Sequence, residues 1–222
     1  MQPKFDLYVG LRFWSAFTHG AGAVVGGFAG LVLMYFAHRQ GAGTMDMVGL
    51  LVFTLSMVAL YTASCLYHSI HTTDQKRLFL RQLDHSMIFV LIAGTYTPIC
   101  LSVLTEPMGW MLLGLIWAMA ILGVIVTLCW LNAPRTVTTL FYVGMGWTAI
   151  LVVKPLFALL APASFVWMLA GGVVYTIGGV LYALKWPLKN HPTFGAHEIF
   201  HLFILAGSFC FYMMMWSIFV GV

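Results

Sequence analysis

Seven apolar stretches, separated by charged residues and by Gly or Pro, run along almost the whole chain. They cover residues 13–37, 48–70, 83–104, 109–131, 137–153, 164–184 and 198–221. Most reach the ~20 residues that a helix needs to cross the hydrocarbon core of a bilayer, and the fifth is the shortest. The pattern predicts an all-α polytopic membrane protein in which a bundle of seven transmembrane helices forms a single domain over residues 1–222.

Composition narrows the class, since 62% of the residues are hydrophobic and only 7% are charged. That is too little polar surface for a soluble globule, and the apolar stretches are too long for the alternating strands of a transmembrane barrel. The first stretch is longer than the apolar core of a cleavable signal, so we expect a retained span of a multi-pass cell-membrane protein. The four cysteines fall within predicted spans without a CxxC pair, which indicates buried thiols and no disulfides. Gly22, Gly26 and Gly30 repeat every four residues, which predicts close helix packing.

Basic residues predict the orientation of the bundle, because Lys and Arg concentrate on the cytoplasmic side of membrane proteins. With the N-terminus inside and the C-terminus outside, the outer segments hold only Arg39 and Lys154. The inner segments then hold the other eight basic residues: Lys4, Arg12, Lys76, Arg77, Arg81, Arg135, Lys185 and Lys189. We interpret Lys76, Arg77 and Arg81 as a basic loop that sets the topology and contacts lipid headgroups.

This topology brings six of the eight histidines to one membrane depth, near the predicted cytoplasmic face. They are His68, His71, His85, His191, His197 and His201. Ionisable groups within membrane spans are energetically unfavourable and usually mark function, so their convergence at one level indicates a functional site.

Two of these histidines, His197 and His201, stand four residues apart and therefore project from one helix face. Together they can share one cation. A catalytic zinc takes three protein ligands and keeps one position for water, and His68 is the best candidate for the third, with Ser64 one turn before it on the same face. Asp84 could then hold the water and take its proton, and Ser64 could steady an oxyanion. The sequence thus predicts zinc on His68, His197 and His201.

The segment from His197 to His201 also fits the H-E-x-x-H pattern, in which Glu198 would be the general base of a zinc protease. The chain after His201 contains no Asp, Glu or His, so the downstream ligand that such proteases usually carry is missing. Glu198 remains an alternative base, or an acid at a helix N-terminus. We interpret four other histidines as interfacial or hydrogen-bonded residues: His19, His38, His71 and His191. His85 adjoins Asp84 but should point to a different face.

The polar motifs of the chain, taken in sequence order, resemble those of the hemolysin III group of the progestin and adiponectin receptor family, which is more distantly related to alkaline ceramidases. The matching pieces are Thr18-His19-Gly20, Ser64 to Ser69, Leu83 to Ser86, Ala93 to Pro98, Gly144 to Trp147, Gly171 to Tyr175, and His197 to Phe203. The resemblance implies a seven-helix bundle with zinc near the cytoplasmic face, the same three histidine ligands, and roles for Asp84 and Ser64. Relatives often carry Glu and Asn where this chain has Arg12 and Ser15, and a His where it has Phe211.

Three functions follow as hypotheses. The first is a zinc-dependent hydrolase of a membrane lipid amide or ester, such as a ceramide-like lipid. The second is a receptor or sensor without catalysis in which zinc is structural. The third is a pore-forming haemolysin, which the sequence supports poorly because the polar groups gather at one depth. We expect the bilayer and a lipid substrate as partners, and no nucleic acid.

Overall fold

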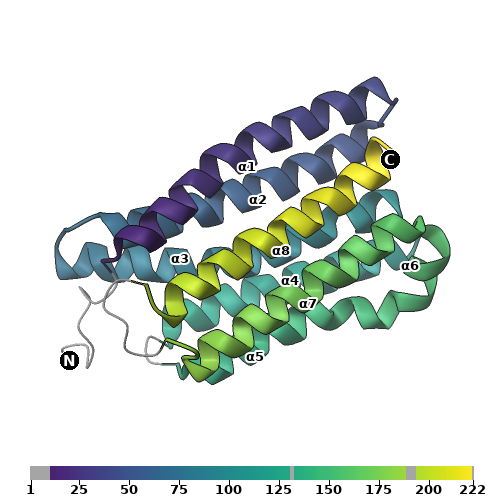
Figure 1. Cartoon of the computed structure of the whole chain (residues 1–222). Coiled ribbons are helices and arrows are strands. Elements are labelled where there is room, and N and C mark those ends of the chain that lie inside the picture. The colour runs from purple at the N-terminus through teal and green to yellow at the C-terminus, as the bar shows by residue number, and fades with distance from the viewer. Residues whose placement is uncertain (1–10, 131–132, 189–193, 222) are drawn as a thin grey trace.

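The computed structural model describes residues 11–130, 133–188 and 194–221, and in these ranges the secondary structure is helical throughout. The helices lie side by side in one bundle (Figure 1). Their bounds are α1 Phe13–Arg39, α2 Thr44–Ser69, α3 Asp74–Ser102, α4 Met108–Cys129, α5 Arg135–Gly146, the 3-10 helix η2 Trp147–Val152, α6 Val153–Leu159, α7 Pro162–Leu184 and α8 Ala196–Phe219. Seven spans in the described residues are long and apolar enough to cross a membrane, the fifth running from Thr136 through η2 to Leu159. The prediction of an all-α, seven-span membrane protein is confirmed.

Two spans differ from their predicted bounds by well over one helical turn. The third helix begins at Asp74, about two turns earlier than the sequence pattern indicated. Its first turns carry Lys76, Arg77 and Arg81, which gave this segment the composition of a loop. The interpretation of Arg77 as a headgroup contact is wrong, because its side chain is completely buried. The fifth span continues past the predicted end at residue 153, since Lys154 lies within helix α6 and does not terminate the span.

Helix α1 packs closely on α2 through its regularly spaced glycines. A side chain at Gly26 would meet Met57, and one at Gly30 would collide with Thr54. Gly22 likewise faces side chains of α2 and α8. These contacts confirm that Gly22, Gly26 and Gly30 form the close-packing face that their spacing predicted.

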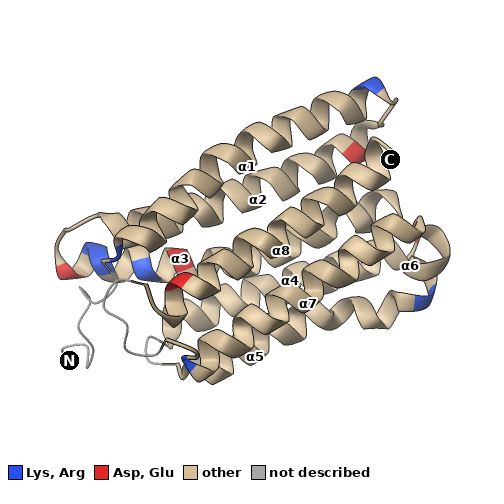
Figure 2. Ribbon diagram, in the orientation of Figure 1, with Lys and Arg blue, Asp and Glu red and all other residues tan. Residues whose placement is uncertain are grey.

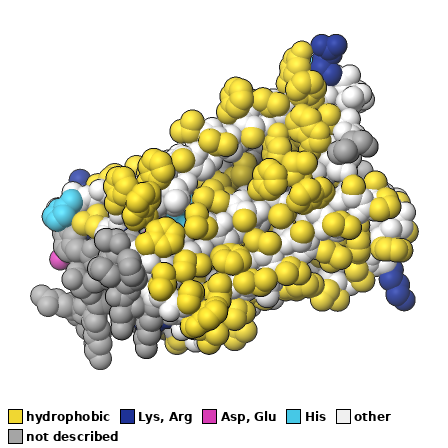
Figure 3. Space-filling view, viewed as in Figure 1, with side chains coloured by type: hydrophobic (Ala, Val, Ile, Leu, Met, Phe, Trp, Pro, Cys, Tyr) yellow, Lys and Arg dark blue, Asp and Glu magenta, His cyan; other side chains and the backbone are white. Residues whose placement is uncertain are grey.

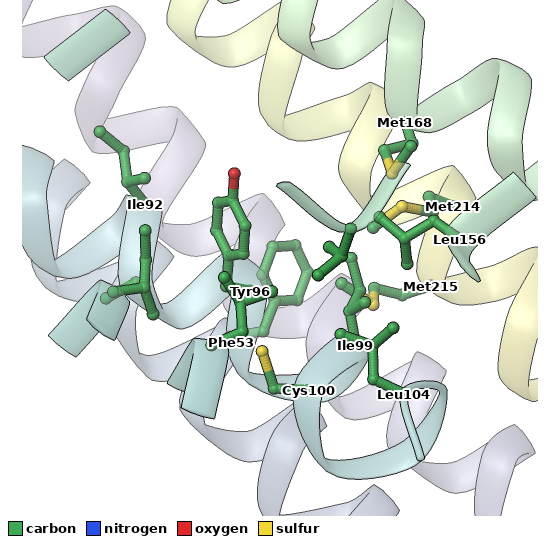
Figure 4. Packing of buried hydrophobic residues seen from close by; sticks show 14 of the residues in the cluster. Phe53, Ile92, Tyr96, Ile99, Cys100, Leu104, Leu156, Met168, Met214 and Met215 are labelled. Atoms are coloured by element: carbon green, nitrogen blue, oxygen red, sulfur yellow. The ribbon is translucent and has the colours of Figure 1, made fainter. Parts of the chain in front are cut away.

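Apolar side chains fill the end of the bundle where α1 ends and α2 begins. Figure 4 shows part of this cluster, including Phe53 from α2, Tyr96 and Cys100 from α3, and Met214 and Met215 from α8. The four cysteines are free, and Cys100 and Cys210 are buried as predicted. The prediction of a buried thiol is wrong for Cys129, which is exposed, and Cys65 is only partly buried. Apolar side chains also cover much of the outer surface between the two ends in Figure 3, as expected for a surface in contact with lipid.

Basic residues are more numerous at the opposite end, where α1, α3 and α8 begin (Figure 2). We call this the basic end, and it carries Arg12, Lys76, Arg77, Arg81 and Lys185. Arg39 and Lys154 lie at the other end. This distribution matches the predicted orientation, which itself stays a prediction. Lys4, Lys189 and His191 lie outside the described residues.

Candidate metal centre

Three histidines meet at the basic end of the bundle. His68 comes from the last turn of α2, and His197 and His201 from the first two turns of α8. One ring nitrogen of each lies within 4.8 Å of the others. His68 and His201 are buried and His197 is partly buried. The structure thus brings together the three residues that the sequence suggested as metal ligands.

The spacing of these nitrogens suits a single cation. The Nε2 atoms of His68 and His197 are 3.1 Å apart. Two imidazoles that bind zinc tetrahedrally, at about 2.0–2.1 Å each, place their nitrogens about 3.3 Å apart. The three ring centroids are 4.6 to 5.1 Å apart and the rings are inclined to one another, so their edges can converge on a common point. Imidazole binds several transition metals, and zinc is among the commonest of them.

Two further predicted residues border this cluster. An oxygen of Asp84, about three turns into α3, lies 4.0 Å from Nε2 of His68, which is too long for a direct hydrogen bond but suits a bridging water. Ser64 is completely buried one turn before His68. Its hydroxyl faces the Asp84 carboxyl without forming a hydrogen bond of good geometry. Asp84 is therefore close enough to His68 to share a bridging water with it, and Ser64 lies beside Asp84.

Glu198 is occupied by other partners. One carboxylate oxygen accepts the Gly195 N–H at 2.7 Å and so caps the start of α8. The Arg12 guanidinium donates to both oxygens at 3.0 and 3.1 Å, and the Ser15 hydroxyl donates to one of them at 3.0 Å. This arrangement fits the helix N-terminal role and disfavours Glu198 as general base, because its lone pairs are directed toward α1 and the cap.

Backbone contacts fix the end of α2 around His68. The N–H of Arg12 donates to the His68 carbonyl at 3.0 Å. The buried guanidinium of Arg77 donates to the carbonyls of Tyr67 and Ile70, and it lies 4.5 Å from the centre of the Tyr67 ring. The last carbonyls of a helix have no partner within the helix, so these donors satisfy groups that would otherwise be buried without one.

His19 is the residue that the sequence interpretation placed wrongly. It is not interfacial but lies about two turns inside α1, 3% exposed, with no hydrogen-bond partner on either ring nitrogen. Its ring stacks on His201, with a centroid distance of 3.7 Å and an interplanar angle of 10°. The signal that could have found it was its presence in the first family-like motif, Thr18-His19-Gly20. The ring of His19 therefore packs against the ring of His201, one of the three candidate metal ligands, and helps to hold it in position.

Three other histidines in the described part of the chain do not belong to this cluster. His71 is exposed beyond the end of α2, and His38 is exposed near the opposite end of the bundle. His85 neighbours Asp84, and its backbone carbonyl accepts a hydrogen bond from Tyr142. Only His68, His197 and His201 form a potential metal-binding group among the described residues.

A cavity with a mainly apolar lining lies next to the cluster. Helices α2, α3, α5, α7 and α8 line it. Phe200, which adjoins His201, and Ile88, one turn after Asp84, form part of its wall toward the basic end. Leu91, Ile204 and Phe211 continue the wall away from that end. The lining of the cavity is mainly apolar, as in most sites for small ligands.

The fold and these features define a multi-pass membrane protein with a buried histidine site. Comparison with known proteins agrees: the family model described as "Haemolysin-III related" matches residues 13–212. The chain belongs to this haemolysin III family.

Among its relatives, Hemolysin-3 of Bacillus cereus is 40% identical over 195 residues, covering 87% of this chain and 85% of the relative. A Hemolysin-3 homolog of Bacillus subtilis is 38% identical over 194 residues, which is 87% of either chain. The Adiponectin receptor protein of Drosophila melanogaster is more distant, at 24% identity over 227 residues, covering 88% of this chain and 48% of the relative. No solved structure matches the chain significantly.

Proposed function

We propose that this protein is a zinc-dependent hydrolase that cleaves an amide or ester of a long-chain lipid within the membrane. The observation that carries the proposal is the convergence of three imidazoles and the Asp84 carboxyl beside an apolar cavity. The histidines offer a ligand set suited to catalytic zinc, and the cavity offers an apolar lining suited to an acyl chain.

The polar residues divide the chemistry as follows. Zinc on the three histidines would supply Lewis acidity toward water and toward the substrate carbonyl. Asp84 takes the proton that the attacking water loses and passes it to the leaving amine or alcohol as the carbon–nitrogen or carbon–oxygen bond breaks. Ser64 donates a hydrogen bond to the oxyanion. The acyl chain lies in the apolar cavity, which also keeps bulk water away from the reaction.

The test is a hydrolysis assay with purified, zinc-loaded protein and a panel of ceramides, other N-acyl amides and acyl esters, with released fatty acid measured by mass spectrometry. Wild-type protein should cleave at least one class. Asp84→Asn should lower turnover at least ~100-fold while zinc remains bound. The matched control is Asp46→Asn, which removes the carboxylate that caps α2 at the opposite end and should leave turnover within about twofold. A zinc-loaded protein that cleaves nothing in the panel, or an Asp84→Asn protein as active as wild type, would overturn the proposal.

A receptor without catalysis is the second candidate, and the similarity to a protein named as an adiponectin receptor favours it. In that case, His197→Ala should destabilise the bundle and no product should ever form. A pore is supported by the name of the bacterial relatives alone. The described structure argues against one, because its buried charged groups cluster at the basic end and the residues that line the cavity beyond them are all uncharged.

A further inference from the structure

Three hydroxyl groups meet inside the bundle, outside the group of three candidate metal ligands. Tyr61 on α2 donates to Ser208 on α8 at 2.6 Å, and Ser208 is also hydrogen-bonded to Tyr175 on α7 at 2.7 Å. Tyr61 and Ser208 are 1% and 3% exposed. We call these three residues the hydroxyl triad.

The hydroxyl triad lies at its own depth in the membrane. Tyr61 precedes His68 by seven residues on α2, and Ser208 follows His201 by seven residues on α8. Seven residues of helix span about 10 Å. The hydroxyl triad is therefore about two turns away from the candidate metal centre along both helices, in the direction in which the cavity extends.

One hydroxyl proton of the hydroxyl triad has no acceptor. Three hydroxyls carry three protons, but in the described part of the chain they form only two hydrogen bonds. If Tyr175 donates to Ser208, the Ser208 proton is left buried and unpaired, which is unfavourable by about 1–3 kcal/mol. If Ser208 donates to Tyr175, the hydroxyls run head to tail and the bonds strengthen one another. The spare proton then belongs to Tyr175, which lines the cavity.

Other hydroxyls on the cavity wall are satisfied by the protein itself. Thr95 donates to the Leu91 carbonyl at 2.8 Å and Thr176 donates to the Gly172 carbonyl at 2.7 Å. Thr139 on α5 is an exception, since its buried hydroxyl has no partner. Tyr175 differs from Thr139 in being backed by two further hydroxyls that polarise its O–H group.

The packing of α7 on α8 positions the Tyr175 side chain at the cavity wall. Its ring crosses α8 at Gly207, where any side chain would collide with the ring. The ring also packs against Phe211, one turn further along α8, with centroids 5.4 Å apart. Contacts with α8 therefore hold the Tyr175 ring in place.

We propose that Tyr175 donates a hydrogen bond to an oxygen atom carried part-way along the acyl chain of the ligand, so that the protein selects hydroxylated or keto acyl chains over plain ones. This inference rests on the proposed function only in that an acyl chain occupies the cavity with its polar head at the histidines. The selective oxygen is the one that lies about 10 Å from that head. One satisfied hydrogen bond should favour the oxygenated chain by about five- to tenfold in affinity.

The experiment measures binding to the purified, zinc-loaded full chain in lipid nanodiscs. A fluorescent fatty acid is displaced by octadecanoic acid or by its monohydroxy isomers, with the hydroxyl moved stepwise along the chain. Wild-type protein should bind one group of neighbouring mid-chain isomers about five- to tenfold more tightly than the plain acid. Tyr175→Phe should abolish this preference and leave the affinity for the plain acid within about twofold. Thr95→Val, which removes a hydroxyl with its own acceptor from the same cavity, should keep the preference.

The possible results distinguish a failure of this inference from a failure of the proposed function. If wild-type protein binds the plain acid and all its hydroxy isomers with equal affinity, the inference about Tyr175 is overturned. The proposal that the cavity binds an acyl chain is then unaffected. A preference that survives Tyr175→Phe but disappears in Thr139→Val also overturns the inference about Tyr175, because Thr139 is then the donor. Failure of every acid to bind overturns both proposals.

Discussion

Arg12 and Glu198 form an ion pair that joins α1 to the first turn of α8, with their closest atoms 3.0 Å apart although 186 positions separate them in the chain. Glu198 is 1% exposed and the Arg12 side chain 29% exposed. The backbone N–H of Arg12 also binds the carbonyl of His68. Arg12 therefore contacts both helices that carry the candidate metal ligands.

Removing one member of this pair should destabilise the protein more than removing both. Arg12→Met leaves a buried carboxylate without its cation and should lower the free energy of unfolding by about 3 kcal/mol, whereas Arg12→Met with Glu198→Met should recover part of that loss. Thermal unfolding in detergent, monitored by circular dichroism, compares the stabilities of the single and double variants. Asp46→Asn controls for loss of a helix N-terminal acid and should change stability by less than ~1 kcal/mol. A double variant as unstable as the sum of the two single changes would argue against the pairing.

Arg77 should be a structural residue and not a lipid contact. Its guanidinium binds two carbonyls at the end of α2, so Arg77→Met should lower the free energy of unfolding by about 2–3 kcal/mol. Lys76→Met is the matched control, because Lys76 is exposed in the same turn, and its effect should stay within about 0.5 kcal/mol. Equal effects of the two substitutions in chemical unfolding would contradict the assignment.

His19 should act through the ring of His201 without itself binding the metal. His19→Ala removes the stacked ring and should weaken zinc affinity by about tenfold, since groups that orient metal ligands commonly contribute this much. His19→Phe keeps a flat ring and should retain one zinc per chain with a smaller loss of affinity. Chelator competition followed by zinc analysis measures both variants. Complete loss of zinc from His19→Phe would make His19 a ligand and refute this role.

Helix packing predicts opposite effects for two glycine substitutions. A Cβ at Gly49 would lie 2.8 Å from the backbone Cα of Pro98, so Gly49→Ala should force α2 from α3 and destabilise the protein by about 1–3 kcal/mol. At Gly114 on α4, an added methyl group would have nothing within 4 Å, so Gly114→Ala should be neutral or stabilising by up to about 1 kcal/mol. Thermal unfolding of the two variants side by side checks the difference in sign.

The fold was predictable from sequence because a bilayer admits few backbone structures. Uninterrupted apolar runs must form helices there, and their number and approximate bounds followed directly. The errors arose where charge was taken as a signal of a loop. Arg77 is buried by a tertiary contact with the end of α2, and Lys154 begins a short helix, and neither fact is visible in local hydropathy.

The candidate metal ligands were predictable from the sequence, but the residues that pack around them were not. His197 and His201 share a helix face by spacing alone, and topology then brought His68 to the same level. His19, Arg12 and Ser15 reach the site only through the packing of α1 against α8, which no local pattern encodes. Arg12 and Ser15 both contact Glu198, so they form one connected polar network with the start of α8.

Metal content tests the central claim most directly. Protein purified without chelators should contain about one zinc ion per chain by inductively coupled plasma mass spectrometry. His68→Ala, His197→Ala and His201→Ala should each lose it, while His38→Ala, which removes an exposed histidine near the other end of the bundle, should retain it. Folded wild-type protein that takes up no metal even when zinc is supplied, or three histidine variants that bind as much as His38→Ala, would contradict the account.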